Sequence, residues 1–278
     1  MIVVFDVGQS KTVAGIFTDS GDLVISKLFS GRDSLLSEKN GIKSFLDHRD
    51  LKHIIVGVAG LSRLHETWKT EFLSIAETAG VPIGSTGFFS DAELFGFQLS
   101  PGSLGLSIGT GSVILKKEND GKISLFGGWG YLFGDELSGV WWFRETVRQA
   151  LCELETNSGN TKVLDWLCRK YEIIPERGVL IKSVYNSERN IQAQIGSESL
   201  SMFQASRWMK NSMKTGIQTF FENVPNDFNH VCFQGGLLLS SDWLQSEIIQ
   251  YVKGINPHVS FETIDSLLPG GFQCWKSL

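Results

Sequence analysis

Residues 2–29 read IVVFDVGQSKTVAGIFTDSGDLVISKLF, and residues 104–126 read LGLSIGTGSVILKKENDGKISLF. Both stretches contain an apolar run, a turn rich in glycine and hydroxyl residues, a second apolar run, a polar turn and a third strand-like run. Buried strands have such runs, and glycine with polar residues marks the turns between them. We therefore expect two successive hairpins to occur twice, as an internal duplication.

Strand and helix patterns continue after each copy. Apolar runs at 53–58 and 87–89 are each followed by a helical pattern, and a further buried strand is expected at 230–234. The sequence between the second copy and that strand is mostly helical, and its stretch 187–221 predicts a long helix, with a break near Gly196. The fold class is therefore expected to be α/β.

The duplication also predicts the domain boundaries. We expect an N-terminal lobe over 1–103 and a C-terminal lobe over 104–278 that is enriched in helices. Two lobes of this kind leave an interlobe cleft, where small molecules bind. The C-terminal segment contains one strand-like run, 259–263, and its return to the first lobe is an open alternative.

Composition limits the class of protein. The chain of 278 residues is long enough for two cores, and its net charge of −5 without any basic tract argues against nucleic-acid binding. No apolar run approaches the roughly 20 residues that span a bilayer. The N-terminus enters a strand without a basic leader, so we expect a cytoplasmic protein with no membrane segment.

The cysteines and histidines predict no metal site. Cys152, Cys168, Cys232 and Cys274 are scattered without the spacing of metal ligands, so we expect reduced thiols. The five histidines lie in unrelated contexts and form neither a metal set nor a catalytic triad.

The turn after the first strand has the composition of an anion-binding loop. Gly8 allows a tight hairpin in which backbone N–H groups converge, while Ser10, Lys11 and Thr12 add donors and a positive charge. Asp6, at the strand end, is suited to hold a magnesium ion through its water shell. This is not a Walker loop, because no helix follows. An ordinary polar hairpin is the alternative.

The matching turn of the second copy is equally rich in donors. It consists of Gly109, Thr110, Gly111 and Ser112. Two such turns at equivalent places of a duplicated unit are expected to face each other and to hold phosphate. Gly235 and Gly236, after the strand at 230–234, allow a flat group such as a purine to approach the backbone, and a plain strand-to-helix turn is the alternative.

Two acidic positions stand out by their context. Asp91 follows a short strand and precedes a helix, so it is either the helix N-cap or a general base that accepts a proton from a hydroxyl. The loop at 127–138, GGWGYLFGDELS, places Asp135 and Glu136 after four glycines in eight residues. These two acids either contact a ligand or form a solvated pair at a helix start.

In chain order, these motifs resemble a known family. They are Asp-Val-Gly-Gln-Ser-Lys-Thr at 6–12, Gly-Val-Ala-Gly at 57–60, Ser-Asp-Ala at 90–92, Gly-Thr-Gly-Ser at 109–112 and Gly-Gly-Trp-Gly-Tyr-Leu-Phe-Gly-Asp-Glu at 127–136. The set resembles the N-acetylglucosamine kinase branch of the sugar kinase/Hsp70/actin superfamily, also called the BadF/BadG/BcrA/BcrD ATPase family.

The resemblance implies two ribonuclease-H-like lobes that close on ATP and magnesium and phosphorylate an amino sugar, N-acetylglucosamine at its 6-hydroxyl. It implies that Asp91 is the catalytic aspartate and that Asp6 holds the metal. Matched to ATP are Asp6, Gly8, Ser10, Lys11, Thr12, Gly109, Thr110, Gly111, Ser112, Gly235 and Gly236. Matched to the sugar are Ala59, Gly60, Asp91, Gly128, Trp129, Gly130 and Asp135. A homodimer is left open.

Three departures from the family pattern bear on the sugar. Leu137 stands where the family usually has glycine, and within 30–34, where relatives often carry an asparagine for the sugar, Asp33 is a candidate substitute. The segment 269–273 lacks the usual helix of small residues. Two other functions therefore stay open. One is an ATPase that activates a partner such as a 2-hydroxyacyl-CoA dehydratase, with an iron–sulfur cluster held by cysteines, and the other is a non-catalytic sugar sensor.

Overall fold

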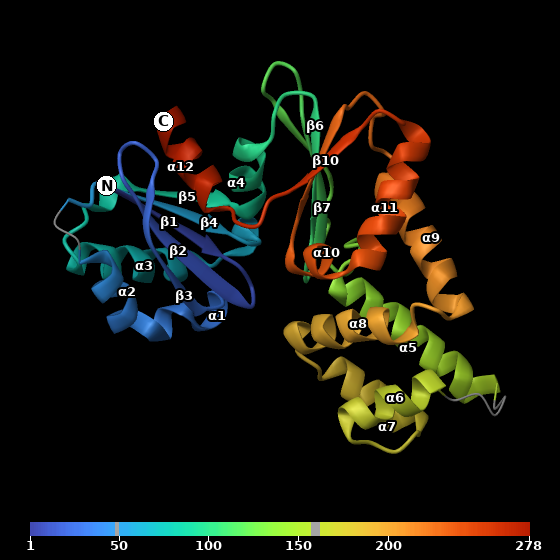
Figure 1. The fold of residues 1–278 in the computed structure, drawn as a ribbon. Coiled ribbons are helices and arrows are strands. Elements are labelled where there is room, and N and C mark those ends of the chain that lie inside the picture. The colour runs from blue at the N-terminus through green and yellow to red at the C-terminus, as the bar shows by residue number, and fades with distance from the viewer. Residues whose placement is uncertain (48–49, 157–161) are drawn as a thin grey trace. The chain divides into compact units, whose positions relative to one another are not determined.

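The computed structural model describes residues 1–47, 50–156 and 162–278 of the chain (Figure 1). The strands are β1 (Ile2–Val7), β2 (Lys11–Phe17), β3 (Leu23–Ser30), β4 (His53–Val58), β5 (Thr86–Ser90), β6 (Ser103–Ile108), β7 (Ser112–Lys117), β8 (Ile123–Gly127), β9 (His230–Gln234) and β10 (Ser260–Thr263). The helices are α1 (Arg32–Leu35), α2 (Lys39–Leu46), α3 (Glu66–Thr78), α4 (Asp91–Gln98), α5 (Gly139–Thr156), α6 (Lys162–Tyr171), α7 (Arg177–Tyr185), α8 (Arg189–Phe203), α9 (Arg207–Phe221), α10 (Gly236–Ser240), α11 (Asp242–Ile255) and α12 (Leu268–Ser277).

Two five-stranded sheets with the same strand order confirm the duplication and the α/β fold class. The first sheet has the order β3-β2-β1-β4-β5, and the second, read from its other edge, has the order β8-β7-β6-β9-β10. In both, an antiparallel meander of three strands is extended by two strands that run parallel to its first strand. This is the topology of ribonuclease-H-like lobes that the resemblance implies.

The chain divides into two compact units. The first unit consists of Met1–Ser100 with Ser266–Leu278, and the second consists of Pro101–Asp265. The last helix, α12, therefore belongs to the unit that begins the chain. No helix in the described part of the chain is both long and apolar enough to cross a membrane.

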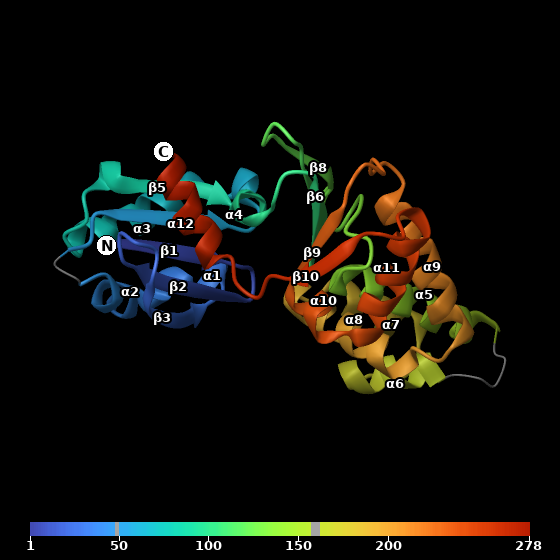
Figure 2. The same ribbon diagram turned by 45° about the horizontal axis from the view of Figure 1, so that its top comes forward.

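Helices cover both faces of the first sheet (Figures 1 and 2). Helices α1, α2 and α3 pack on the face that carries Val3, Phe5 and Val7, and they form one apolar core with it. Helices α4 and α12 pack on the opposite face and against each other. Gly57 of β4 permits this approach, because a Cβ atom there would overlap with the Leu94 side chain of α4.

The second unit holds two apolar cores. Helices α9 and α11 pack with Leu104, Leu106, Val231 and Phe233 on one face of the second sheet. Helices α5, α6, α7 and α8 surround a separate core that includes Trp166. The second unit therefore carries a helical subdomain between β8 and β9, in agreement with the sequence analysis.

The long helix predicted over 187–221 is two helices. Helix α8 ends at Phe203, and α9 begins at Arg207 after Ser206, whose side chain accepts a hydrogen bond from the Met209 N–H. The break expected near Gly196 was wrong, because a glycine at this position lets α8 lie directly on Gly139 of α5. The serine cap, and not the glycine, ends the helical run.

The C-terminal segment also differs from its expected form. The helix said to be missing at 269–273 is present as α12, and it contains Gly270 and Gly271 where it packs on α4 and β1. A Cβ atom on Gly270 would overlap with the Leu94 carbonyl oxygen, and one on Gly271 would overlap with the Val4 side chain. The small residues thus set the distance between α12 and the sheet.

We predict that Gly270→Ala destabilises the protein by about 1–3 kcal/mol, because the added methyl group must displace backbone atoms of α4. The matched control is Gly254→Ala in α11, where a Cβ atom meets nothing within 4 Å. That change should stabilise the protein by about 0.5–1 kcal/mol through helix propensity. Urea unfolding of both variants measures the two effects, and equal effects would contradict the packing described for α12.

Candidate functional site

The carboxyl ends of three parallel strands bring together predicted site residues of the first unit. Strands β1, β4 and β5 are neighbours, and Asp6 lies opposite Gly57 while Val58 lies opposite Ser90. Asp6, the Ala59–Gly60 pair and Asp91 therefore stand at one edge of the sheet. Ligands of open α/β sheets bind at this edge.

Asp6 and Asp91 interact electrostatically. Burial of the Asp6 carboxyl, with the negative charge of Asp91 as a second cause, raises the pKa of Asp6 to about 7, and the Lys11 charge opposes this rise. Burial also raises the pKa of Asp91, whereas hydrogen bonds from its own N–H and from the Ala92 N–H act in the opposite direction. Two carboxyl groups share a poorly hydrated place here, which is the kind of oxygen donor set that a hard divalent cation neutralises.

Helix capping does not account for Asp91. The N-cap of α4 is Ser90, whose hydroxyl accepts a hydrogen bond from the Glu93 N–H at 3.1 Å. The Glu93 carboxylate in turn accepts a hydrogen bond from the Ser90 N–H at 2.7 Å, which completes a capping box. Asp91 is the first residue of the helix, and its carboxylate accepts only from backbone N–H groups beside it. Asp91 is therefore not the N-cap of α4, and that interpretation was wrong.

The hairpin turn after β1 presents its residues unequally. The Gly8 N–H donates to the Lys11 carbonyl at 3.0 Å and closes the turn, and the Ser10 and Lys11 side chains are exposed. Thr12 is fully buried, and its cross-strand partner is Val7, so it lies on the sheet face opposite to Asp6. Its hydroxyl has no hydrogen-bond partner among the described residues. The Thr12 side chain is thus buried in the fold, whereas the Ser10 and Lys11 side chains are exposed.

Arg32 is a site residue that the sequence analysis did not single out. Its Nη1 donates to the Ala59 carbonyl at 2.9 Å, and its Nε pairs with Asp33 at 2.9 Å. Arg32 therefore fixes the backbone just before Gly60. The Asp33 side chain is 74% exposed and bound only at the surface by Arg32. The position of Arg32 directly after Gly31, at the start of a helix, was the only sequence signal.

Glycines from two strand ends meet in the second unit. Gly235 follows β9 with φ +101°, and a Cβ atom there would overlap with the Ile108 carbonyl oxygen at the end of β6. A Cβ atom on Gly109 would lie 3.8 Å from the Gly236 nitrogen. Because β6 and β9 are parallel neighbours, the predicted phosphate turn and the predicted adenosine turn lie side by side. Only glycine fits this contact at residue 235.

Asp135 joins the turn at 109–112 to the glycine-rich loop. The Ser112 N–H donates to Asp135 Oδ1 at 3.3 Å, and the Asp135 carboxylate lies against Gly111. The Gly139 N–H, at the start of α5, donates to the Gly109 carbonyl at 2.9 Å. None of these bonds uses the Thr110 or Gly111 N–H group. Asp135 is buried, so the interpretation of a solvated helix-start pair is wrong for this residue.

The pKa of Asp135 is raised, and burial is the largest cause. The hydrogen bond from Ser112 and the positive charges of Arg189 and Arg144 act against the rise, while Glu136 adds to it. The carboxylate is therefore held by the turn, and the charges of two arginines on helices of the same unit favour its ionised form.

Arg144 also fixes the loop that the resemblance assigns to the sugar. Its guanidinium donates to the Tyr131 carbonyl and, at 2.9 Å, to the Gly134 carbonyl. The loop is thereby pinned at its middle and at its end. Its apolar side chains stay outside, since Trp129 is 74% and Phe133 81% exposed. An exposed indole on a pinned backbone is a surface on which a sugar ring can stack.

Leu137 keeps the backbone shape of the glycine it replaces. Its φ angle is +66°, and its side chain is fully buried. The room for this side chain comes from Gly216 of α9, where a Cβ atom would lie 2.7 Å from Leu137 Cδ2. A left-handed leucine costs on the order of 1–2 kcal/mol, which burial of its side chain offsets. The leucine at position 137, where the family usually has glycine, is therefore a buried residue of the core.

We predict that Asp6→Asn changes how stability depends on pH. The folded protein holds the Asp6 proton up to about pH 7, whereas the ordinary pKa of an aspartate in the unfolded chain is 3.8. As the pH rises between these values, the free energy of unfolding of the wild type should therefore fall, relative to that of Asp6→Asn, by up to about 1.4 kcal/mol per pH unit. Above the higher value the difference between the two proteins should stay constant. Urea unfolding without divalent cations, from pH 4 to pH 8, measures the difference.

A constant difference over that range would show that Asp6 is hydrated in the folded state. The exposed residue Asp120 provides the control, because its carboxylate accepts a hydrogen bond from the Lys122 N–H that an asparagine can also accept. The Asp120→Asn variant should follow the wild type at every pH.

Comparison with known proteins rests on structure. No protein-family model matches the chain, and no curated protein matches its sequence. A proposed N-acetylglucosamine kinase from Chromobacterium violaceum superposes with a TM-score of 0.72 at 14% identity, over 98% of each chain. A second proposed N-acetylglucosamine kinase, from Porphyromonas gingivalis, gives 0.69 at 16% identity, also over 98% of each chain.

A ROK family glucokinase from Streptomyces griseus, solved with glucose and AMPPNP, gives a TM-score of 0.59 at 12% identity over 98% of each chain. Identities this low relate folds and not activities. The chain has the α/β fold of these sugar kinases, which confirms the fold class that the resemblance implied.

Proposed function

We propose that this protein transfers the γ-phosphoryl group of ATP to a hydroxyl group of an amino sugar, N-acetylglucosamine at its 6-hydroxyl in the first instance. The single observation that supports this most is the pair Asp6 and Asp91, two half-buried carboxyl groups that interact electrostatically at the carboxyl edge of the first sheet. One of them can serve a cation, and the other is left to serve as a base.

Asp91 is the general base in this proposal. A base works best when its pKa lies closer to the working pH than that of a free carboxylate, and burial raises the pKa of Asp91 in that direction. The two backbone N–H groups that bond its carboxylate fix the orientation of the carboxylate oxygens. Asp91 would accept the proton of the sugar hydroxyl as that oxygen attacks phosphorus.

Asp6 is the residue proposed to hold magnesium. Its raised pKa records the cost of a charge placed beside Asp91, and a divalent cation would remove that cost. When bound with ATP, magnesium neutralises the charge that develops on the phosphate oxygens. Lys11, whose charge lowers the pKa of Asp6, is proposed to contact a phosphate.

The turns of the second unit are proposed to bind the nucleotide. The Thr110 and Gly111 N–H groups would donate to phosphate, and the side-by-side glycines at 109 and 235 would admit the adenosine close to the backbone. The names of two structural neighbours, both proposed N-acetylglucosamine kinases, favour an amino sugar over glucose. In this chain, the pinned loop with exposed Trp129 is the proposed sugar contact.

A coupled assay of ADP release with a panel of sugars tests the proposal. With Mg-ATP we expect release that depends on the added sugar, fastest with N-acetylglucosamine, slower with N-acetylmannosamine and slowest with glucose. ADP release at the same rate without sugar would support an ATPase that acts on a partner. Sugar binding without ADP release for any member of the panel would support a sensor.

We predict that Asp91→Asn lowers kcat by about a hundredfold or more, the range for a lost general base, and leaves the dissociation constants of ATP and sugar unchanged. Asparagine keeps the size and both backbone hydrogen bonds can persist, so folding should be preserved. The control is the exposed Asp120→Asn change, which should leave kcat at its wild-type value. A kcat near wild type for Asp91→Asn would exclude Asp91 as the base.

A further inference from the structure

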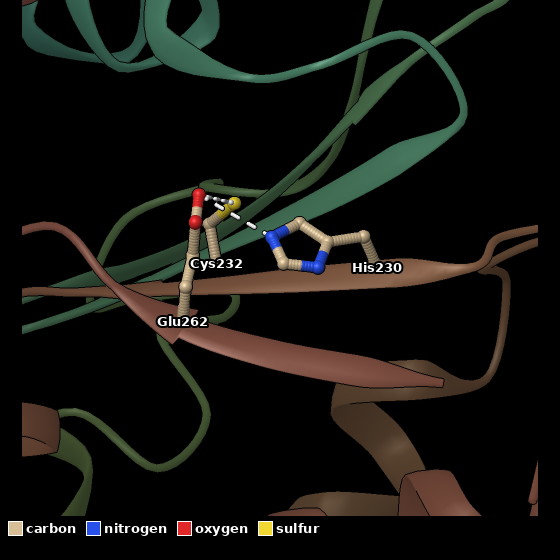
Figure 3. A group of neighbouring side chains, drawn as sticks. All are labelled: His230, Cys232 and Glu262. Carbon is tan, nitrogen blue, oxygen red and sulfur yellow. Dashed lines mark hydrogen bonds and ion pairs between the residues drawn. The ribbon is translucent and has the colours of Figure 1, made fainter. Parts of the chain in front are cut away.

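Three side chains that the proposed reaction does not use converge on one face of the second sheet (Figure 3). His230 and Cys232 lie two residues apart on β9, and Glu262 is the register partner of Cys232 on β10. Glu262 Oε1 lies 3.3 Å from His230 Nε2 and 3.2 Å from Cys232 Sγ. The three ligand atoms all lie within 4.8 Å of one another.

Two of the three separations are close to those around a tetrahedral zinc ion. Zinc bonds of about 2.0–2.1 Å to nitrogen, 2.3 Å to sulfur and 2.1 Å to oxygen place neighbouring ligand atoms about 3.4–3.6 Å apart. The two separations to Glu262 Oε1 differ from this by a few tenths of an ångström, and the third lies within 4.8 Å. Rotation of the side chains would bring all three ligand atoms to one cation.

A second hydrogen bond orients the histidine ring. The Ser260 hydroxyl lies 2.7 Å from His230 Nδ1 and 3.4 Å from the Asn229 carbonyl, so when the hydroxyl donates to that carbonyl its oxygen accepts from His230 Nδ1–H. With the proton on Nδ1, the lone pair of Nε2 faces the Glu262 carboxylate. Two electron-rich atoms 3.3 Å apart need a cation between them, either a proton on Nε2 or a metal ion.

The nearest positions on β6 carry small residues. The register partner of His230 on β6 is Ser103, which is fully buried and whose hydroxyl has no hydrogen-bond partner among the described residues. The register partner of Cys232 is Gly105, which adds no side chain. A buried hydroxyl without a partner next to three potential ligands is unusual, and a metal-bound water would give it one.

We propose that His230, Cys232 and Glu262 bind one thiophilic divalent cation, Zn²⁺ in the first instance. Three protein ligands leave a fourth position for water, to which the Ser103 hydroxyl can hydrogen-bond. Binding breaks the Cys232 S–H bond, forms a sulfur–metal bond and releases the proton to solvent. Magnesium does not fit this donor set, because it avoids thiolate ligands.

The site is independent of the proposed kinase chemistry. His230 begins β9, whereas Gly235 follows the opposite end of the same strand, about 16 Å away along an extended chain. A cation here would tie β10, the edge strand of the sheet, to its neighbour β9. We therefore expect it to stabilise the second unit, and its test needs no kinase activity.

Titration of the full-length, chelator-treated protein with Co²⁺ tests the site. The wild type should show thiolate-to-cobalt charge transfer and the strong visible absorption of four-coordinate Co²⁺, with one equivalent bound and displaced by one equivalent of Zn²⁺. Cys232→Ser should abolish the charge-transfer band. His230→Gln and Glu262→Gln should each weaken Zn²⁺ binding by at least about a hundredfold, and Ser260→Ala by about ten- to a hundredfold.

The matched controls are Cys168→Ser and Cys274→Ser, two other buried cysteines, which should keep the band. Zn²⁺ should also raise the Tm of the wild type and of both controls but not that of Glu262→Gln, whose exposed side chain tolerates the change. Absence of the charge-transfer band in the wild type would overturn the proposal in favour of a protonated His230–Glu262 ion pair. A band that survives in Cys232→Ser would overturn it equally.

Discussion

The burial of two like-charged groups at one edge of a sheet is the constraint on which the first unit depends. Asp6 and Asp91 each lose hydration, and their mutual repulsion adds to that cost. The two carboxyl groups come close because α4 packs against β4 over Gly57. This packing places Asp91, the first residue of α4, near the end of β1, which carries Asp6. A capping box at Ser90 then fixes where the helix begins. This arrangement lowers stability and keeps the two carboxyl groups close together.

In the second unit, the strand ends come together through close backbone contacts, and not through a pair of charged groups. Its strand ends meet through glycine, and the turn at 109–112 is fastened to the start of α5 and to Asp135. Asp135 therefore belongs as much to the predicted phosphate turn as to the predicted sugar loop. Because Asp135 bonds the turn, movement of the loop would change the positions of the N–H groups of the turn.

Much of this fold could be predicted from the sequence, because the repeated hairpins are local patterns and the strand at 230–234 is a continuous apolar run. What escaped prediction depends on contacts distant in sequence. A break in the helix over 187–221 was expected near Gly196, yet that glycine serves contact with α5. Arg32 gave only a weak signal, since its partner, Ala59, is supplied by another strand end. The site assignments came from motif order, and only Asp91 and Asp135 gained a physical argument against their alternatives.

The same reasoning explains why the His230, Cys232 and Glu262 group was not foreseen. Metal-ligand spacing is recognised in loops and helices, while here two ligands alternate along a strand and the third comes from its neighbour. The alternation of His and Cys at 230 and 232, on a strand whose other face is apolar, was the available signal.

Helix α12 has a consequence for the order in which the protein is made. The ribosome makes this helix after the whole of the second unit, yet the helix packs on a face of the first sheet, so the first unit lacks that cover until residues 268–277 have been made. Residues 101–265 are complete earlier and can fold while the chain is still attached. The first unit of this protein is thus completed by a helix that is made after the second unit.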